Sequence, residues 1–247
     1  MIYLADSNVK LYIIIMLKHI LAIILFFACW AQLDAQYYYG VKGGIGLNMQ
    51  RWNTFERDIL FTPLIDVFAE SADDQVNRVY ASLGYHTRGS AVRGFGFNSF
   101  RQYRFNNLAL ELGFKQMLSV TKKYNGYYML AGRLEYTINT NLGTTPVFSV
   151  LNLVDDAFVN RFNYGLTVGG GFEMNWGEDK VLFLEASINP DASRQYHQPN
   201  IAVITNPNPS QFNPNPTITI QPQEVRNVSL EVKIGVKFLR GYYDEEY

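Results

Sequence analysis

The feature that most constrains this chain is an alternation of apolar and polar residues that recurs along its length. From Tyr37 to Met49 every second residue is apolar or glycine, and the pattern returns in seven later segments. Successive side chains of a β-strand point to opposite faces of a sheet, so a period of two predicts strands with one apolar face. Beyond Gln36 the sequence has no long apolar run and no sustained helical period. The eight predicted strands contain residues 37–49, 65–69, 79–87, 108–118, 128–138, 162–176, 182–188 and 228–238.

The faces opposite the apolar ones hold charged residues whose signs nearly balance. They include seven acidic and six basic residues, whereas the apolar faces of the same spans carry no charge. Such a balance is expected of groups that pair inside a closed lumen, and a face exposed to water does not need it. The predicted lumen charge network consists of Lys42, Asp66, Glu70, Arg88, Glu111, Lys115, Arg133, Glu135, Glu173, Glu185, Glu231, Lys233 and Lys237.

Alternation alone also fits a soluble sandwich or lipocalin, in which the charged face meets water and the apolar face fills the core. Two features favour a membrane barrel instead. The longest alternating segments exceed the usual strand of about 5–6 residues and reach the roughly 9–11 residues that a tilted strand needs to cross a membrane. The predicted connections also alternate between long and short, as external loops and periplasmic turns do. These connections are 51–63, 71–76, 89–103, 119–125, 140–160, 177–179 and 189–224.

We therefore predict an all-β fold, an eight-stranded antiparallel up-and-down transmembrane β-barrel formed by residues 36–247. The interior of a barrel this small has room for side chains and little else. Long charged side chains would fill this interior, so we do not expect a wide diffusion pore.

The first 35 residues are interpreted as an N-terminal extension followed by a signal peptide. A start at Met16 would give a short basic region with Lys18 and His19, followed by an apolar stretch over 20–30. This arrangement, with a small residue at the end, is typical of a secretion signal. We expect cleavage after Ala35, and residues 1–15 would then have no structural role.

Two other interpretations of this segment stay open. Cys29 could belong to a lipoprotein signal, although the bulky Phe26 and Phe27 argue against it, and the apolar stretch could be an uncleaved anchor helix. Cys29 is the only cysteine. Removal of the signal would leave no thiol in the mature chain, as suits export to an oxidising compartment.

Two strands carry a resemblance to a known family. The first contains the run Tyr39-Gly-Val-Lys-Gly-Gly-Ile-Gly-Leu-Asn48, and the last contains Leu230-Glu-Val-Lys-Ile-Gly-Val-Lys-Phe238. Together with the signal that ends at Ala35, the chain resembles small outer-membrane β-barrel proteins of the PorT-like type over residues 36 to about 239. The resemblance implies the outer membrane of a Gram-negative bacterium. The closing strand is similar to the signal of barrel assembly, but residues follow Phe238, so either Phe238 or the terminal Tyr247 could be recognised.

The chain offers few residues for catalysis or metal binding. Lys plus Arg number 21 and Asp plus Glu number 22, so the formal net charge of −1 gives no indication of a nucleic-acid partner. Only His86 and His197 would remain after signal removal, and we expect His86 to be a hydrogen-bonded lumen residue. Two pairs of adjacent aspartates are interpreted as turn or loop residues rather than catalytic dyads. They are Asp73 with Asp74 and Asp155 with Asp156. We predict no catalytic residue, metal or cofactor.

The segment 189–224 is the most distinctive part of the chain outside the predicted strands. It contains seven of the nine prolines and is far longer than a turn of about 2–5 residues. Two apolar patches in it, 201–204 and 217–220, could pair as a short hairpin above the membrane. Functional residues concentrate on such loops. The candidate partner-binding residues are Ile201, Ile204, Phe212, Ile218 and Ile220.

The sequence therefore favours a non-enzymatic structural or interaction protein of the outer membrane, in contact with its lipid and with a protein partner. It could be an accessory subunit of a larger secretion or assembly complex of the envelope. A narrow solute or ion channel is the second hypothesis, and a surface-facing enzyme is the third.

Overall fold

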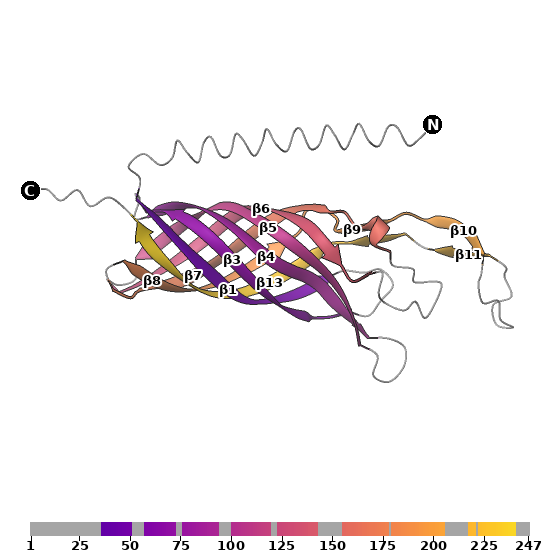
Figure 1. Cartoon of the computed structure of the whole chain (residues 1–247), viewed down its shortest axis with the longest axis horizontal. Coiled ribbons are helices and arrows are strands. Elements are labelled where there is room, and N and C mark those ends of the chain that lie inside the picture. The colour runs from indigo at the N-terminus through magenta and orange to yellow at the C-terminus, as the bar shows by residue number, and fades with distance from the viewer. Residues whose placement is uncertain are drawn as a thin grey trace, which may run out of the picture. The chain divides into compact units, whose positions relative to one another are not determined.

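Eight antiparallel strands close into a barrel in the computed structural model of the chain (Figure 1). The structure describes residues 36–50, 57–72, 76–93, 100–119, 123–142, 155–177, 179–205, 217–220 and 222–240. The described elements belong to one unit, Tyr37–Arg240. The predicted signal (1–35), Asp73, Asp74, Phe212 and the tail 242–247 lie outside the described residues.

All eight predicted strands form, and the predicted fold class is confirmed. Each strand pairs with its neighbours in the chain, and the first strand pairs with the last, which closes the sheet. The register of the closing pair runs from Tyr37 opposite Arg240 to Gln50 opposite Asn227. The strands are β1 (Tyr37–Gln50), β3 (Leu60–Ser71), β4 (Asn77–Arg93), β5 (Phe100–Ser119), β6 (Tyr124–Thr140), β7 (Phe162–Asn175), β8 (Lys180–Pro190) and β13 (Asn227–Arg240).

The two ends of the barrel differ. We call the end where β1 begins and β13 ends the terminal end, and the opposite end the ribbon end. At the ribbon end the β8–β13 hairpin continues as a second pair, β9 (Tyr196–Gln198) with β12 (Gln223–Val225), and then as β10 (Ile201–Thr205) with β11 (Thr217–Ile220) (Figure 1). The predicted hairpin of residues 201–204 and 217–220 therefore forms, with Ile201 opposite Ile220 and Ile204 opposite Ile218. A short 3-10 helix, η3 (Asp156–Phe158), lies beside β9.

The prediction of a long connection over 89–103 is wrong. Strands β4 and β5 remain paired up to Arg93 opposite Phe100, so only residues 94–99 separate them. The alternation continues here, but its polarity is reversed: Tyr103 and Phe105 are buried, whereas Gln102 and Arg104 point outward and are exposed. A search for outward apolar residues could not find this part of the strands.

The predicted connection over 51–63 is also too long. Strand β3 already begins at Leu60, and β2 (Arg57–Asp58) pairs with β4 beyond the end of β3. The β3–β4 ladder stops at Leu64, next to Pro63, whose nitrogen carries no hydrogen to donate. The carbonyl of Thr87 instead accepts hydrogen bonds from the Thr62 hydroxyl at 2.7 Å and the Asn48 amide at 3.3 Å.

A β-bulge lies close to the level at which the polarity reverses. Asn106 pairs with Asn139 and Asn107 with Thr137, which leaves Ile138 as the extra residue of β6. One extra residue moves all following side chains to the opposite face of the strand. Leu142, beyond the bulge, is consequently 1% exposed and packs with Tyr103 and Phe105 in a small core at the ribbon end.

Candidate functional site

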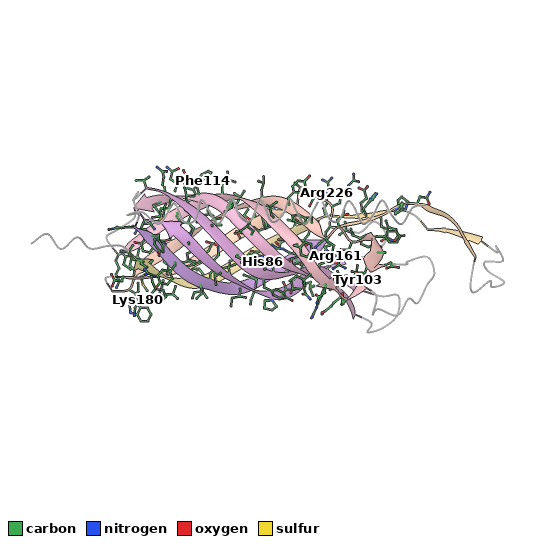
Figure 2. All side chains as sticks on the ribbon, turned by 45° about the horizontal axis from the view of Figure 1, so that its top comes forward. His86, Tyr103, Phe114, Arg161, Lys180 and Arg226 are labelled. Atoms are coloured by element: carbon green, nitrogen blue, oxygen red, sulfur yellow. The ribbon has the colours of Figure 1, made fainter. Side chains whose placement is uncertain are left out.

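The outer wall of the barrel is a continuous apolar belt. Large apolar side chains point outward from all eight strands, and several are very exposed, with Phe172 and Ile234 each at 67%. Figure 2 shows Phe114 standing out from this wall, while His86 lies halfway along the barrel. An exposed apolar surface of this extent on a monomer marks a surface that meets lipid or another protein.

Polar and aromatic rows border the belt at its two ends. Towards the ribbon end, the Thr87 hydroxyl donates to Asn106 at 2.9 Å, and the Asn106 amide donates to Asn139 at 2.6 Å. At the terminal end, the Tyr39 ring lies 5.8 Å from the Phe238 ring. Aromatic girdles at the borders of the apolar band are typical of transmembrane barrels.

The structure buries every member of the predicted lumen charge network. The thirteen residues are each at most 2% exposed. Burial of an ion without a partner is very costly, so pairing is required for such an interior to fold. The pairs fall into two groups, one towards the terminal end and one in the middle of the barrel.

The terminal group is built around two carboxylates. Glu70 lies 2.9 Å from the ammonium of Lys115 and 2.8 Å from that of Lys237, and Glu173 lies 2.6 Å from Lys237. Arg78, which the sequence analysis did not select, joins both carboxylates at 3.0 and 3.3 Å. Arg78 lies an even number of residues from His86 and Arg88 on β4, so its side chain points to the same face of the strand, into the lumen. This alternation is the sequence signal that could have identified it.

Aromatic rings surround the cations of this group. The ammonium of Lys115 lies 4.7 Å from the centre of the Tyr127 ring, and the rings of Tyr80, Phe183 and Phe68 lie at 5.3, 5.4 and 5.5 Å. Each distance is within the range of a cation–π interaction. Lys42 lies beside them, 2.9 Å from Glu185. Charge and rings together fill the cross-section of the barrel at this level.

The middle group is a chain of pairs that crosses the lumen. His86 Nε2 lies 2.6 Å from Asp66, as expected of a hydrogen-bonded lumen histidine, and Asp66 lies 3.3 Å from Lys233. Arg88 binds Glu231 and lies 2.8 Å from Glu135.

Arg133 extends this chain towards the ribbon end. It lies 2.9 Å from Glu135 and also binds Asp191, a buried residue outside the predicted strands. Glu111, directly opposite Arg133 in the β5–β6 register, accepts from the Thr167 hydroxyl of β7 at 3.2 Å.

An apolar cluster, here called the cap, lies at the ribbon end of the lumen. Its core consists of Tyr103, Phe105, Leu142, Tyr196 and Val225, all at most 3% exposed, with Phe158 and Val159 packed against them. The rings of Phe158 and Tyr196 lie 6.2 Å apart in an edge-to-face arrangement. Burial raises the pKa of Tyr196 to about 12, so its hydroxyl stays protonated and donates to Gln198 at 2.8 Å.

Buried amide side chains, here called the amide layer, lie on both sides of the cap: Gln50, Asn189 and Asn227 follow the ion pairs, whereas Gln198 and Gln223 pair beyond Tyr196 and Val225. Along β1, β8 and β13 alike, the inward residues change from charged to amide towards the ribbon end. The side chains of this amide layer are Gln50, Asn189, Gln195, Gln198, Gln223 and Asn227, each at most 1% exposed. Gln50 donates to Gln195 at 2.8 Å and lies opposite Asn227 in the register.

Several polar atoms of this layer have no hydrogen-bond partner among the described residues. They are Asn189 Oδ1, Gln195 Nε2, Gln198 Nε2, both amide atoms of Asn227, and the neighbouring Asp191 Oδ2. Each such atom costs about 1–3 kcal/mol if it stays unsatisfied.

The acidic and histidine residues considered for catalysis or metal binding that the structure describes, Asp155, Asp156 and His197, have structural roles. Asp155 caps η3 by accepting from the Ala157 amide, and Asp156 lies 2.7 Å from Arg161. His197 points outward and lies 3.5 Å from Glu224, which also pairs with Arg194 at 2.8 Å. In the parts of the chain that the structure describes, no group of three His, Cys, Asp or Glu residues could hold a metal ion. The same residues contain no helix that is long and apolar enough to cross a membrane.

Solved structures show which known proteins have a similar architecture. Neisserial surface protein A is 12% identical, with 82% of this chain and 97% of that chain covered and a TM-score of 0.44. Ail, the attachment invasion locus protein of Yersinia pestis, is 10% identical, with 82% of this chain and 99% of that chain covered and a TM-score of 0.39. The outer-membrane protease OmpT of Escherichia coli is 8% identical, with 84% of this chain and 98% of that chain covered and a TM-score of 0.40. No family model and no curated protein matches the sequence.

Proposed function

We propose that this chain is an integral outer-membrane protein of a Gram-negative bacterium with a structural or interaction role. The observation that carries the proposal is the complete apolar belt around a barrel whose inward charges are buried and paired. In water this arrangement would be unfavourable, because the apolar side chains would be exposed and the charged ones buried. In a bilayer the outward apolar side chains contact lipid, and the charged side chains pair in the polar interior. The terminal end then faces the periplasm, and the ribbon end lies outside the cell.

The filled lumen supports a barrel that does not conduct. An ion entering it would have to separate the pairs around Glu70 and Arg88 and pass the apolar cap. These barriers oppose the second hypothesis, a narrow channel. A surface enzyme has less support still, because Asp155, Asp156 and His197 are occupied in capping and ion pairs.

The external ribbon is the proposed partner-binding element. In the described residues, β10 and β11 form a sheet of two strands without a charged residue in either. Sheet edges of this kind present unpaired backbone groups to which an extended segment can add. Ile201, Ile204, Ile218, Ile220 and Phe212 remain the candidates for apolar anchors. The role fits an accessory subunit of a larger envelope complex, in line with the PorT-like resemblance.

Affinity purification from gently solubilised envelopes tests this role. The variant should replace residues 200–221 by a short turn and keep β9 and β12, because Gln198, Gln223 and Val225 are buried in the amide layer and the cap. We expect the intact chain to retain a protein that the trimmed chain loses.

A matched control shortens another external connection, residues 94–99, and should retain the partner. A trimmed chain that keeps every partner would contradict the proposed surface. Failure of the chain to fractionate with the outer membrane would contradict the location.

A further inference from the structure

The described part of the lumen holds one more carboxylate than it holds cations. Asp191 joins the seven acidic members of the lumen charge network, and Arg78 joins the six basic members. Eight carboxylates therefore face seven cations in this interior. A buried charge without a counter-charge is very costly. One further positive charge is needed to balance the interior.

The missing positive charge belongs to the middle group. The terminal group has four cations and three carboxylates: Lys42, Arg78, Lys115 and Lys237 with Glu70, Glu173 and Glu185. The middle group has three cations and five carboxylates: Arg88, Arg133 and Lys233 with Asp66, Glu111, Glu135, Asp191 and Glu231. Among the described residues of the middle group, His86 is the remaining side chain that can become a cation, and it is 1% exposed.

His86 contacts groups of both signs through its two ring nitrogens. Its Nε2 lies 2.6 Å from Asp66, and because a carboxylate only accepts hydrogen bonds, Nε2 carries a hydrogen. Its Nδ1 lies 3.1 Å from Nη2 of Arg88, which donates, and 3.7 Å from Oε1 of Glu231, which accepts. A neutral His86 can therefore bind Arg88 through Nδ1, whereas a protonated His86 can donate from Nδ1 to Glu231.

The surroundings of His86 favour the second of these arrangements. Arg88 does not depend on His86 for a partner, since it also lies 2.8 Å from Glu135 and binds Glu231. The charged groups that face the lumen from the surrounding strands include more carboxylates than cations. They are Lys42 on β1, Asp66 on β3, Arg88 on β4, Glu111 on β5, Glu135 on β6, and Glu231 and Lys233 on β13.

We propose that His86 is a proton-binding site and is a cation in the folded barrel at neutral pH. A proton from solvent binds at Nδ1 as the chain folds, which makes Nδ1 a donor to Glu231 and joins Asp66, His86 and Glu231 in one buried chain. Nearby carboxylates in a confined space of low polarity favour the charged imidazole. The inference is independent of the partner-binding role, because His86 lies halfway along the barrel (Figure 2), whereas β10 and β11 form a separate sheet.

NMR of the imidazole nitrogens tests the proposal directly. The chain should carry His19→Gln and His197→Gln, so that His86 is its only histidine, and should be labelled with nitrogen-15 and refolded in detergent micelles. We expect both ring nitrogens of His86 to carry a hydrogen at neutral pH. A single protonated nitrogen would show that His86 is neutral and would overturn the proposal.

A change in the number of buried carboxylates tests the physical reason. Glu111→Gln removes one carboxylate without a direct contact to His86, so the interior is balanced without the extra proton, and His86 should become neutral at neutral pH. The control Glu224→Gln removes an outward acid that pairs with Arg194, and it should leave His86 charged. If Glu111→Gln does not fold, Asp191→Asn makes the same change in the charge count. A His86 that stays charged in the lumen variant would show that its proton does not compensate the excess carboxylate.

Discussion

Arg133 shows at the scale of one residue what the interior of this barrel demands. Its side chain is fully buried, lies 2.9 Å from Glu135 and binds Asp191 on its other side. A guanidinium can serve two carboxylates at once because its donors form a rigid planar fork. The neighbouring Leu134 points the opposite way and is 47% exposed on the wall. Consecutive residues thus face environments of opposite polarity.

Replacement of Arg133 should destabilise the barrel strongly. Arg133→Leu leaves Glu135 with one cation and Asp191 without its partner, and breaking a buried pair in this way costs about 3–5 kcal/mol. Arg161→Leu is the matched control, because its pair with Asp156 is about 40% exposed and should be worth at most about 1 kcal/mol. Urea unfolding in lipid vesicles measures both. Equal effects of the two substitutions would contradict the assignment of Arg133 to a closed interior.

Leu134→Arg tests the opposite face of the same strand. A cation on the lipid side of a barrel costs about 2–4 kcal/mol near the middle of the membrane. Leu134→Met, which stays apolar and has a similar volume, should cost less than about 1.5 kcal/mol. If Leu134→Arg folds in lipid vesicles as well as Leu134→Met does, the wall does not face lipid, and the soluble-barrel interpretation gains support.

At the scale of the strand, the alternation carries more information than its apolar members alone. It predicted all eight strands, because each has apolar residues outward along the belt. It missed the ends of β4 and β5, because beyond the belt the outer face is polar and the inner face, with Tyr103 and Phe105, is apolar. The burial of Leu142 could not be predicted for another reason: the bulge at Ile138 turns the side chains that follow it to the opposite face of the strand.

Parts of the candidate site were beyond reach of the sequence for related reasons. The thirteen lumen charges follow from strand facing, and so would Arg78 if the pattern were extended by one residue. Which carboxylate meets which cation depends on register. Glu70 and Lys237 lie far apart in sequence, but they are close in the barrel because β3 and β13 both pair with β1. Asp191 and Gln195 are positioned by the irregular backbone between β8 and β9, where no period applies.

The cap should behave as a separate small core. Phe105→Ala removes a fully buried ring, a change that typically costs about 3–5 kcal/mol in a core. Phe114→Ala on the exposed wall is the control and should have a smaller effect. We expect Phe105→Ala to make the ribbon end sensitive to chymotrypsin while the barrel keeps its heat-dependent gel mobility. Unchanged protease resistance would mean that Phe105 does not hold the cap.

At the scale of the whole molecule, the interior divides into two regions. Ion pairs with aromatic rings occupy the terminal end and the middle, and the buried amides and the apolar cap share the ribbon end. An eight-stranded barrel leaves just enough room for such side chains. The molecule therefore has two independent barriers to ions, one electrostatic and one apolar.

Electrical recording distinguishes this arrangement from a channel. The full chain in a planar bilayer should give no discrete conductance steps, because an ion would have to displace paired groups in a confined space of low polarity. Phe105→Ala should also give none, since opening the cap leaves the pairs around Glu70, Glu135 and Glu231 in place. Steps in Phe105→Ala but not in the unaltered chain would make the cap the only barrier. Steps in the unaltered chain that vanish on heat unfolding would show that the barrel conducts, and the channel hypothesis would then replace the structural one.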